Sequence, residues 1–454
     1  MKKIIVLLLL FLVFIIGFLP VRDPDFGWHY RCGEQFLTTG QLCLSNNFSY
    51  FLPDYKSFYT GHLYDILLAL AYNQGGFQLI SIIAAAILAL SAYLFLKLVN
   101  ENNIIGIFGF FITFFLSNNV FYLGLRPQIL SYLLFLLVLL ILKRQNKKEF
   151  FMIPALFIFC TNFHIGFFIG LVPLFFYVLH KRNLSSAVVF LLSLFSTLIN
   201  PFGILVYKEI FNHALSPLNL MIAEWVRPVF WQMILIICLG LSALIKILVT
   251  KPLSLFGLLL VLFFSLLGLL AQRNFPYFYA VFFYIILRDV KFNLNHLHSL
   301  AAPLLAGIII FVAIIGLPKT IESNTSWQTH CDYGAGVSSY PCQAIQKYPQ
   351  LSGNVFANYE WGGFLIWKKP GIKVFVDGRM PAWKDENDNS PYQVYLEIMQ
   401  AKNNWNEKLK IIKTDYLLIA GGTFLDLKLQ KDPKKYGWVE KYRDNISVIY
   451  IKSH

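Results

Sequence analysis

Apolar residues run through most of the chain in long blocks that short polar segments separate. A helix that crosses the hydrocarbon core of a membrane needs about 20 such residues. The pattern therefore predicts a polytopic α-helical membrane protein with about eleven spans, several of them short. The blocks lie at residues 4–20, 77–99, 103–118, 128–142, 150–160, 165–180, 184–200, 229–250, 253–271, 275–287 and 299–317.

Basic residues between these blocks set an orientation. With the N-terminus in the cytoplasm, most lysines and arginines of the short loops fall on the inner side, as the positive-inside rule requires. One long helix over residues 150–180, in place of two short ones, would instead put Lys181 and Arg182 outside and the C-terminal region inside. We expect two short helices, a cytoplasmic N-terminus and a location in the plasma membrane.

Two sizeable segments then lie outside. The first outer loop spans residues 21–76, and its end at 63–72 has the pattern of an amphipathic helix that lies on the membrane. From Pro318 onward the composition turns polar and the pattern alternates as it does in strands. We expect a transmembrane domain over residues 1–317 and a small extracytoplasmic α/β domain over residues 318–454.

The pattern within this C-terminal region predicts strands that alternate with helices. The expected strands are residues 354–357, 373–376, 416–420 and a final hairpin through Trp438 and 446–451; the expected helices are 359–367 and 392–412.

Composition agrees with a membrane protein. The 454 residues are 57% hydrophobic and only 14% charged, which excludes a soluble protein of this size. The formal net charge is +14, but the basic residues are scattered and form no stripe, so we expect anionic membrane lipids as neighbours and no nucleic acid.

Four of the six cysteines form two close pairs on the predicted outer side, Cys32 with Cys43 and Cys331 with Cys342. This arrangement indicates two disulfides in an oxidising compartment, with free thiols as the alternative. Zinc is disfavoured, because no histidine or third cysteine has ligand spacing.

Polar residues of the hydrophobic part gather at the outer ends of the predicted helices. Carboxylates at a membrane edge are expensive unless they face water, a metal or a substrate, so Asp23 and Asp25 mark a candidate site. A transporter would place polar groups near the midplane, where this chain is almost entirely apolar. The pattern favours an outward-facing enzyme. The other polar residues of this set are Trp28, His29, Arg126, Gln128, Asn162, His164, Asn200, Glu224, Arg227, Arg273 and Asn274.

These residues carry a family resemblance. The segment Asp23 to Gly33, read as Asp-x-Asp-x-x-Trp-His-x-x-x-Gly, resembles the first outer loop of the GT-C membrane glycosyltransferases. Other segments are similar to a prokaryotic branch of that superfamily, related to protein O-mannosyltransferase-like proteins. They are Arg126-Pro127-Gln128, Asn162-Phe163-His164, Asn200-Pro201-Phe202-Gly203, Glu224-Trp225, Arg273-Asn274-Phe275-Pro276, Tyr359 to Trp367 and Val376 to Arg379. Asp23-Pro24-Asp25 is not the Asp-Glu pair of the O-mannosyltransferases, so their sugar and acceptor are not carried over.

The resemblance implies transfer of a sugar from a polyprenyl-phosphate carrier to a glycan, lipid or protein acceptor at the outer face. Such a transfer needs a carboxylate that deprotonates the acceptor, and we assign this role to Asp25, with Asp23 as second choice. Arginine binds phosphate with two parallel hydrogen bonds, so Arg126 and Arg273 are the candidates for the carrier phosphate. The remaining candidate substrate-binding residues are Trp28, His164 and Glu224.

A divalent cation is compatible with these residues. Asp25 and His29, with Glu224 as a further donor, form a set that suits Mg or Mn. Some GT-C branches resemble metal-independent enzymes, and the sequence leaves both possibilities open.

Each candidate also has a structural interpretation. Asp23 can cap the following helix, Trp28 and His29 can anchor it at the interface, and Arg126 can mark the membrane edge. Asn200 fits a helix terminator, and Glu224 an ion pair with Arg227. We expect Asp65 to lie on a solvated helix face, although the first loops of GT-C enzymes can offer a second acid there. We expect Asp377-Gly378-Arg379 to be first a turn and second a binding site.

Two other functions remain open. A polyprenyl-lipid or glycan transporter would move its solute without cleaving a donor. A non-catalytic scaffold of envelope assembly would keep the fold and tolerate replacement of Asp25 by asparagine.

Overall fold

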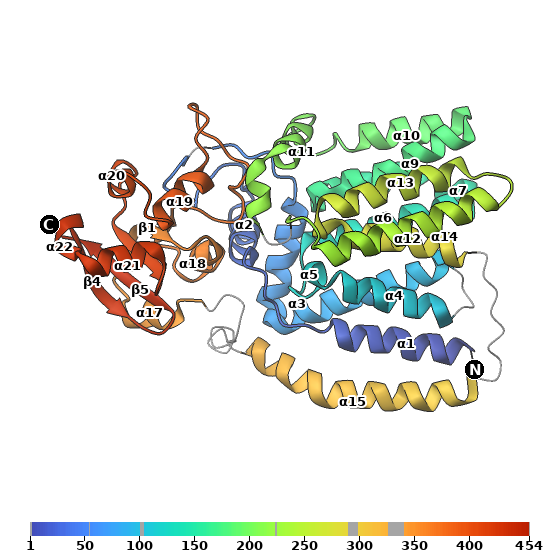
Figure 1. Cartoon of the computed structure of the whole chain (residues 1–454), viewed down its shortest axis with the longest axis horizontal. Helices are drawn as coiled ribbons and strands as arrows, with labels where there is room; N and C mark the ends of the chain where they lie inside the picture. The colour runs from blue at the N-terminus through green and yellow to red at the C-terminus, as the bar shows by residue number, and fades with distance from the viewer. Residues whose placement is uncertain are drawn as a thin grey trace. The chain divides into compact units, whose positions relative to one another are not determined.

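The computed structural model describes residues 2–53, 55–99, 104–222, 225–288, 298–325 and 340–453. The chain forms two compact units, each built from separate segments of sequence (Figure 1). The helical unit comprises Met1–Val21, Gly75–Val206 and Leu220–Glu322. The α/β unit comprises Arg22–Gln74, Tyr207–Asn219 and Ser323–His454.

Most helices of the helical unit run roughly alongside one another (Figure 1). They are α1 (Lys2–Gly17), the second part of α3 (His62–Val99), α4 (Ile104–Leu116), α5 (Asn118–Phe121), α6 (Pro127–Arg144), α7 (Lys147–Phe151), α8 (Ile153–Phe163), η1 (Ile165–Phe167), α9 (Phe168–Lys181), α10 (Leu184–Ser196), α12 (Phe230–Val249), α13 (Leu255–Leu270), η3 (Gln272–Asn274), α14 (Phe275–Leu287) and α15 (His298–Thr325).

Four helices of the described chain are long and apolar enough to cross a membrane: His62–Val99, Pro127–Arg144, Phe230–Val249 and Pro303–Glu322. Shorter apolar helices occupy several of the other predicted blocks. The prediction of a helical membrane protein is therefore supported, while the number of eleven spans is not confirmed.

Two breaks in the helices were expected from sequence and are confirmed. In α3, Gly75 (φ −148°, ψ 17°) and Gly76 (φ 58°, ψ −155°) separate the segment that begins at His62 from the apolar segment that ends at Val99. Extended backbone at His164 ends α8, so residues 150–180 form two helices and not one.

A mixed five-stranded sheet organises the α/β unit. Its order is β2-β1-β3-β5-β4, with β1 parallel to β2 and β3, and β5 antiparallel to β3 and β4. Each strand predicted from the sequence is present. The strands are β1 (Gly353–Ala357), β2 (Ile372–Val374), β3 (Tyr416–Ala420), β4 (Trp438–Arg443) and β5 (Ser447–Lys452).

Helices from three distant parts of the chain complete the α/β unit. They are α2 (Phe26–Thr39), the first part of α3, most of α11 (Leu205–Leu215), the start of η2 (Pro217–Met221), α17 (Cys342–Lys347), η5 (Tyr359–Trp361), α18 (Gly362–Lys368), α19 (Pro391–Met399), α20 (Trp405–Ile411), α21 (Phe424–Lys431) and α22 (Pro433–Tyr436).

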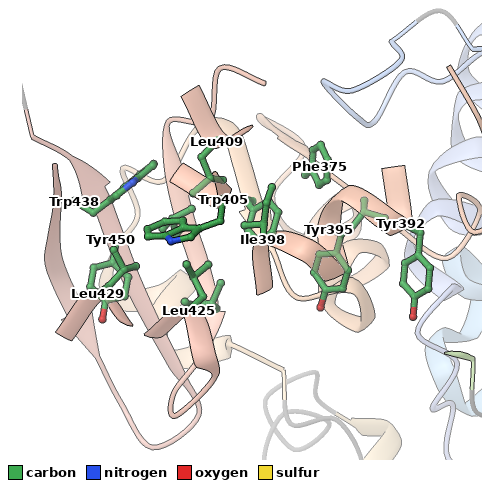
Figure 2. Close-up of a cluster of buried hydrophobic side chains, with 14 of the residues drawn as sticks. Phe375, Tyr392, Tyr395, Ile398, Trp405, Leu409, Leu425, Leu429, Trp438 and Tyr450 are labelled. Carbon is green, nitrogen blue, oxygen red and sulfur yellow. The ribbon is translucent and has the colours of Figure 1, made fainter. Parts of the chain in front are cut away.

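The core of this unit is rich in aromatic residues. Figure 2 shows part of it, with Trp405 and Leu409 of α20 near Leu425 and Leu429 of α21. Full burial of such side chains contributes about 1.5–3 kcal/mol each. The single helix expected at residues 392–412 is wrong: α19 and α20 are separate, because Ala401 (φ 48°) and Asn404 (φ 65°) adopt left-handed backbone between them.

Candidate active site

Asp25 occupies the N-cap position of α2, but its side chain makes no capping hydrogen bond to that helix. Instead, the Trp28 indole Nε1–H donates to Asp25 Oδ1 over 3.1 Å. Asp23 supports the turn that leads into the helix: its Oδ1 accepts from the Asp25 backbone N–H at 3.2 Å, and its carbonyl accepts from that of Phe26. Asp23 thus has a local structural role, whereas the Asp25 carboxylate is held by a side chain.

Two glycines let α2 approach α18 closely. A Cβ on Gly27 would lie 1.7 Å from the Gly363 carbonyl oxygen, and one on Gly363 would lie 2.0 Å from that of Pro24. The space beside the Gly-Gly pair of the Tyr359–Trp367 motif is therefore filled by the chain itself. Arg31 of α2 fixes the other end of α18, because its Nη2 donates to the Trp367 carbonyl at 2.6 Å.

The turn after β2 brings Gly378 against Asp25. A Cβ on Gly378 would lie 1.8 Å from Asp25 Oδ1. The hydroxyl of the half-buried Tyr359 lies 3.4 Å from the Gly378 carbonyl, to which it donates. Burial first, and then negative charges that include Asp25, raise the pKa of Tyr359 well above its usual value. Tyr359 stays a neutral phenol, and the sequence pattern did not single it out as a site residue.

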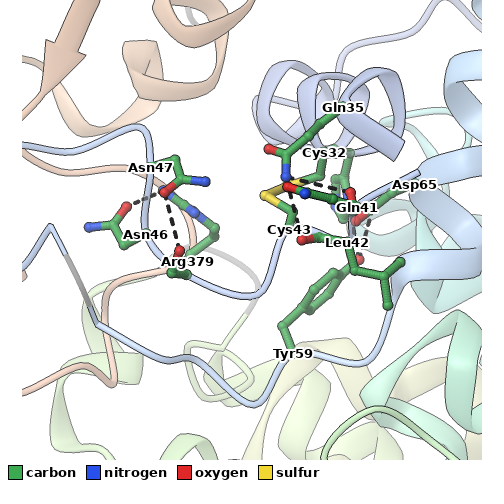
Figure 3. Close-up of a disulfide and its surroundings, with 12 residues drawn as sticks. Cys32, Gln35, Gln41, Leu42, Cys43, Asn46, Asn47, Tyr59, Asp65 and Arg379 are labelled. Atoms are coloured by element: carbon green, nitrogen blue, oxygen red, sulfur yellow. Dashed lines mark hydrogen bonds and ion pairs between the residues drawn. A yellow bond between two sulfur atoms is a disulfide. The ribbon is translucent and has the colours of Figure 1, made fainter. Parts of the chain in front are cut away.

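Asp377 and Arg379 form more than the expected turn. Arg379 Nε donates to Asp377 Oδ1 at 2.8 Å and Nη2 donates to Oδ2 at 2.6 Å, while Asp377 is fully buried. Arg379 Nη2 also donates to Asn46 Oδ1 at 3.0 Å, and Figure 3 shows the two residues. The guanidinium carbon lies 5.7 Å from the centre of a Trp28 ring. The ion pair thus links the β2 turn to the residues around Asp25.

Next to Trp28 along α2, the buried His29 forms a cluster with two other polar side chains, the buried Asp65 and the half-buried Tyr59. His29 Nδ1 is 2.6 Å from Asp65 Oδ1, and the Tyr59 hydroxyl donates to the same oxygen at 3.0 Å (Figure 3 labels Tyr59 and Asp65). Burial raises the pKa of Tyr59 well above its usual value. The expectation that Asp65 faces solvent is wrong: only 1% of it is exposed, because the start of α3 packs on α2 at Gly33.

The described residues offer a metal few protein ligands. No group of three His, Cys, Asp or Glu side chains gathers among them. One ring nitrogen of His29 is hydrogen-bonded to Asp65, the contact by which a carboxylate orients the ring of a metal-binding histidine. Asp25 and His29 therefore fit only a cation that takes its other ligands from water and substrate oxygens, as Mg does.

Other candidates lie in the helical unit. Arg126 is the buried N-cap residue of α6. His164, at the end of α8, forms a 2.7 Å hydrogen bond with the hydroxyl of Ser131, which belongs to α6. The helix that begins after Arg126 therefore also contacts His164. The Arg273 guanidinium lies 3.9 Å above a Trp225 ring. Glu224 lies outside the described residues.

Two asparagines from the same sequence motifs serve the fold. Asn162 Nδ2 donates to the Ile158 and Ile199 carbonyls at 2.8 Å. Asn200 bonds the backbone of its own turn at Phe202 and Gly203, which fits the helix terminator expected there.

A disulfide joins Cys32 of α2 to Cys43, as the spacing predicted (Figure 3). Cys342 is also disulfide-bonded, and its expected partner, Cys331, lies outside the described residues.

No protein-family model matches the sequence, and no curated protein is similar to it in sequence. Solved structures of an oligosaccharyltransferase from Archaeoglobus fulgidus share its fold. The enzyme AglB in complex with an inhibitory peptide and a dolichol-phosphate has a TM-score of 0.58 at 12% identity, over 100% of this chain and 74% of that chain. The apo form gives 0.55 at 12% identity, over 92% and 69%. A complex with Zn and sulfate gives 0.53 at 13% identity, over 99% and 73%. The chain therefore has the fold of this archaeal oligosaccharyltransferase, in keeping with the membrane glycosyltransferase resemblance of its sequence motifs.

Proposed function

We propose that this protein, with its GT-C fold, is an integral membrane glycosyltransferase that moves a sugar from a polyprenyl-phosphate donor to a glycan, lipid or protein acceptor. We place the reaction at the outer face of the plasma membrane. The archaeal enzyme of the same fold was captured in complex with an inhibitory peptide and a dolichol-phosphate, and in another structure tethered with an acceptor peptide. The apolar helices of this chain suit an isoprenoid tail in the same way.

The proposal rests on Asp25, which occupies the N-cap position of α2 but whose side chain makes no hydrogen bond to the backbone of that helix. Aspartate at this position normally accepts a hydrogen bond from the helix backbone, which stabilises the helix by about 1 kcal/mol. The Asp25 side chain makes no such bond, and Trp28 and Gly378 fix its direction instead. A carboxylate that forgoes this bond and is held by other contacts suits a chemical role.

In the proposed reaction, Asp25 accepts the proton of the acceptor hydroxyl. The acceptor oxygen then forms a bond to the anomeric carbon on the face opposite the phosphate. The bond from that carbon to the phosphate oxygen breaks, and its electron pair leaves with the polyprenyl phosphate. Transfer inverts the anomeric configuration, and a well-placed base contributes about 10²–10⁴-fold to the rate.

The leaving phosphate needs cationic donors. We assign Arg126 and Arg273 to it, because the planar guanidinium binds phosphate oxygens in pairs. Contact with the Trp225 ring holds Arg273 in one orientation before the donor binds. Trp28, His164 and Glu224 remain the candidates for sugar and acceptor contacts. A Mg or Mn ion at Asp25 and His29 would add positive charge beside the leaving group.

The test is release of radiolabelled sugar from a panel of polyprenyl-phosphate sugars by the purified protein in membranes. Asp25→Asn should abolish both the transfer of the sugar and the slow hydrolysis of the donor. Asp388→Asn, at an exposed carboxylate of the same unit, should leave both reactions unchanged. Turnover that Asp25→Asn does not affect would refute the assignment. Movement of the intact donor across the membrane without cleavage would identify a transporter.

A further inference from the structure

A continuous series of contacts leads from Asp65 to the proposed base. Asp65 Oδ1 lies 2.6 Å from His29 Nδ1. The His29 ring stacks on Trp28, with centres 3.6 Å apart and planes inclined by 28°. The Trp28 indole in turn donates to Asp25 Oδ1. Four side chains thus connect the start of α3 with the carboxylate at the start of α2.

Two hydrogen bonds hold Asp65 Oδ1. At 2.6 Å, His29 Nδ1 and Asp65 Oδ1 share one hydrogen, whichever of the two atoms carries it. Tyr59 donates its hydroxyl hydrogen to the same oxygen. These two hydrogen bonds to one oxygen hold the Asp65 carboxyl group and, through it, the plane of the imidazole ring.

Rings on two sides restrict His29 further. The Tyr64 and His29 rings make a T-shaped contact with their centres 4.9 Å apart, whereas the His29 and Trp28 rings are stacked. Tyr59 also packs edge-on against Trp28 at 5.2 Å. The indole direction, and so the position of its N–H, depends on the imidazole and phenol that Asp65 holds.

Stability alone is a poor reason for Asp65 at this place. Its second oxygen, Oδ2, is buried and has no hydrogen-bond partner among the described residues. A buried polar atom without a partner costs about 1–3 kcal/mol. The hydrogen bonds from His29 and Tyr59 to Oδ1 are therefore kept despite an unsatisfied oxygen on the same carboxyl group.

We propose that Asp65, acting with Tyr59 through His29 and Trp28, is a positioning residue that sets the direction of the Asp25 carboxylate. The proposal rests on the proposed function, in which Asp25 accepts the acceptor proton. Asp65 itself touches neither substrate nor reacting atoms. Its loss misdirects the base and slows the chemical step, while substrate binding is retained.

The first experiment compares two buried carboxylates of the α/β unit. Asp65→Asn should lower kcat by about 10–100-fold with little change in KM. Asp426→Asn should destabilise the protein and leave the kcat of the folded fraction unchanged, because Asp426 bonds Arg443 and Tyr450 away from this series. If Asp65→Asn loses as much stability as Asp426→Asn but keeps its kcat, Asp65 is only a structural residue and the proposal is overturned.

The second experiment tests the route. Trp28→Phe keeps a ring but removes the N–H, so it cuts the series next to Asp25. Adding Asp65→Asn to Trp28→Phe should then cause no further loss of kcat, since both changes act on one contact. Additive losses would mean that Asp65 acts by another path.

A third measurement needs no turnover and separates the two proposals. In protein labelled with 5-fluorotryptophan, the Trp28 resonance is assigned by its absence in Trp28→Phe. Asp65→Asn and His29→Asn should shift this resonance, and Asp426→Asn should not. If Asp65→Asn leaves the Trp28 resonance unshifted, the positioning role of Asp65 is overturned even if Asp25 is catalytic. If the resonance shifts but Asp25→Asn does not affect turnover, only the proposed function is overturned.

Discussion

Asp25 and Gly378 lie so close that a methyl group on Gly378 would fall 1.8 Å from Asp25 Oδ1. The glycine comes from the turn after β2, more than 350 positions along the chain from the aspartate. Its missing side chain is therefore part of how the carboxylate is held.

Gly378→Ala should displace the Asp25 carboxylate and reduce transfer by about 100-fold, the size of effect that a shift of about 1 Å has on a catalytic group. The measurement is kcat with the best lipid-linked donor. Gly371→Ala is the control, because a Cβ on Gly371 meets nothing within 4 Å. Normal activity in Gly378→Ala would show that Asp25 can move without consequence.

Gly27→Ala should loosen the pairing of α2 with α18. The obstacle is the Gly363 carbonyl, a backbone atom that cannot rotate away, so we expect a loss of about 1–3 kcal/mol in the free energy of unfolding. Pulse proteolysis in detergent measures it. Gly421→Ala, where a Cβ makes only ordinary contacts, should cost much less.

Asp426→Asn should destabilise the sheet of the α/β unit by about 1–3 kcal/mol. Its carboxylate accepts hydrogen bonds from Arg443 at 2.8 Å and Tyr450 at 2.5 Å, so the change weakens both bonds and leaves Arg443 ion-paired only with Glu440 among the described residues. The loss should appear as a lower denaturant midpoint. Arg443→Lys, which keeps the charge but not the fork, should be intermediate.

Lys368 should make the free energy of unfolding vary with pH in the alkaline range. Burial, and then the charge of Arg31, lower the pKa of Lys368 to about 8. Between about pH 8 and 10 the unfolded chain binds this proton more tightly than the folded one, so stability should rise with pH. Melting temperatures at pH 7.5 and 9.5 test this, and Lys368→Met should remove most of the rise. A fall in wild-type stability over this range would contradict it.

Loss of the Cys32–Cys43 disulfide should cost about 2–3 kcal/mol, the amount expected for a closed loop of this length. Replacement of both cysteines by serine, followed by proteolysis of the first loop, measures the effect. Cys160→Ser, at a cysteine outside any described disulfide, is the control and should not alter cleavage.

Local patterns predicted much of the fold. The apolar run Tyr416–Ala420 has the length of a buried strand and forms β3 with the expected bounds. The break at Gly75 and Gly76 was visible as a polar and glycine interruption between two apolar segments. The two turns that split α19 from α20 were not predicted. Asparagine at 404 favours left-handed backbone, but alanine at 401 carries no such signal.

The site was harder to predict because its contacts join distant segments. Asp23, Asp25, Trp28 and His29 stand together in sequence and attracted attention for that reason. Asp65 lies 36 residues from the histidine it holds, and its helix alone suggested a solvated face. Tyr359 and Gly378 reach Asp25 only through the tertiary fold, which no periodicity reports.

The bond from Arg31 to the Trp367 carbonyl spans 336 residues of chain. At a synthesis rate of about 5–20 residues per second, α2 leaves the ribosome roughly 20–60 s before α18. During that time the helix that carries Asp25 lacks the partner on which Gly27 packs. The loop closed by Cys32 and Cys43 lies entirely within the earlier segment, so oxidation can secure one end of α2 while translation continues. The disulfide can therefore form before the contacts around Asp25 are complete, so a chain that ends before α18 would lack the glycine partner of Gly27.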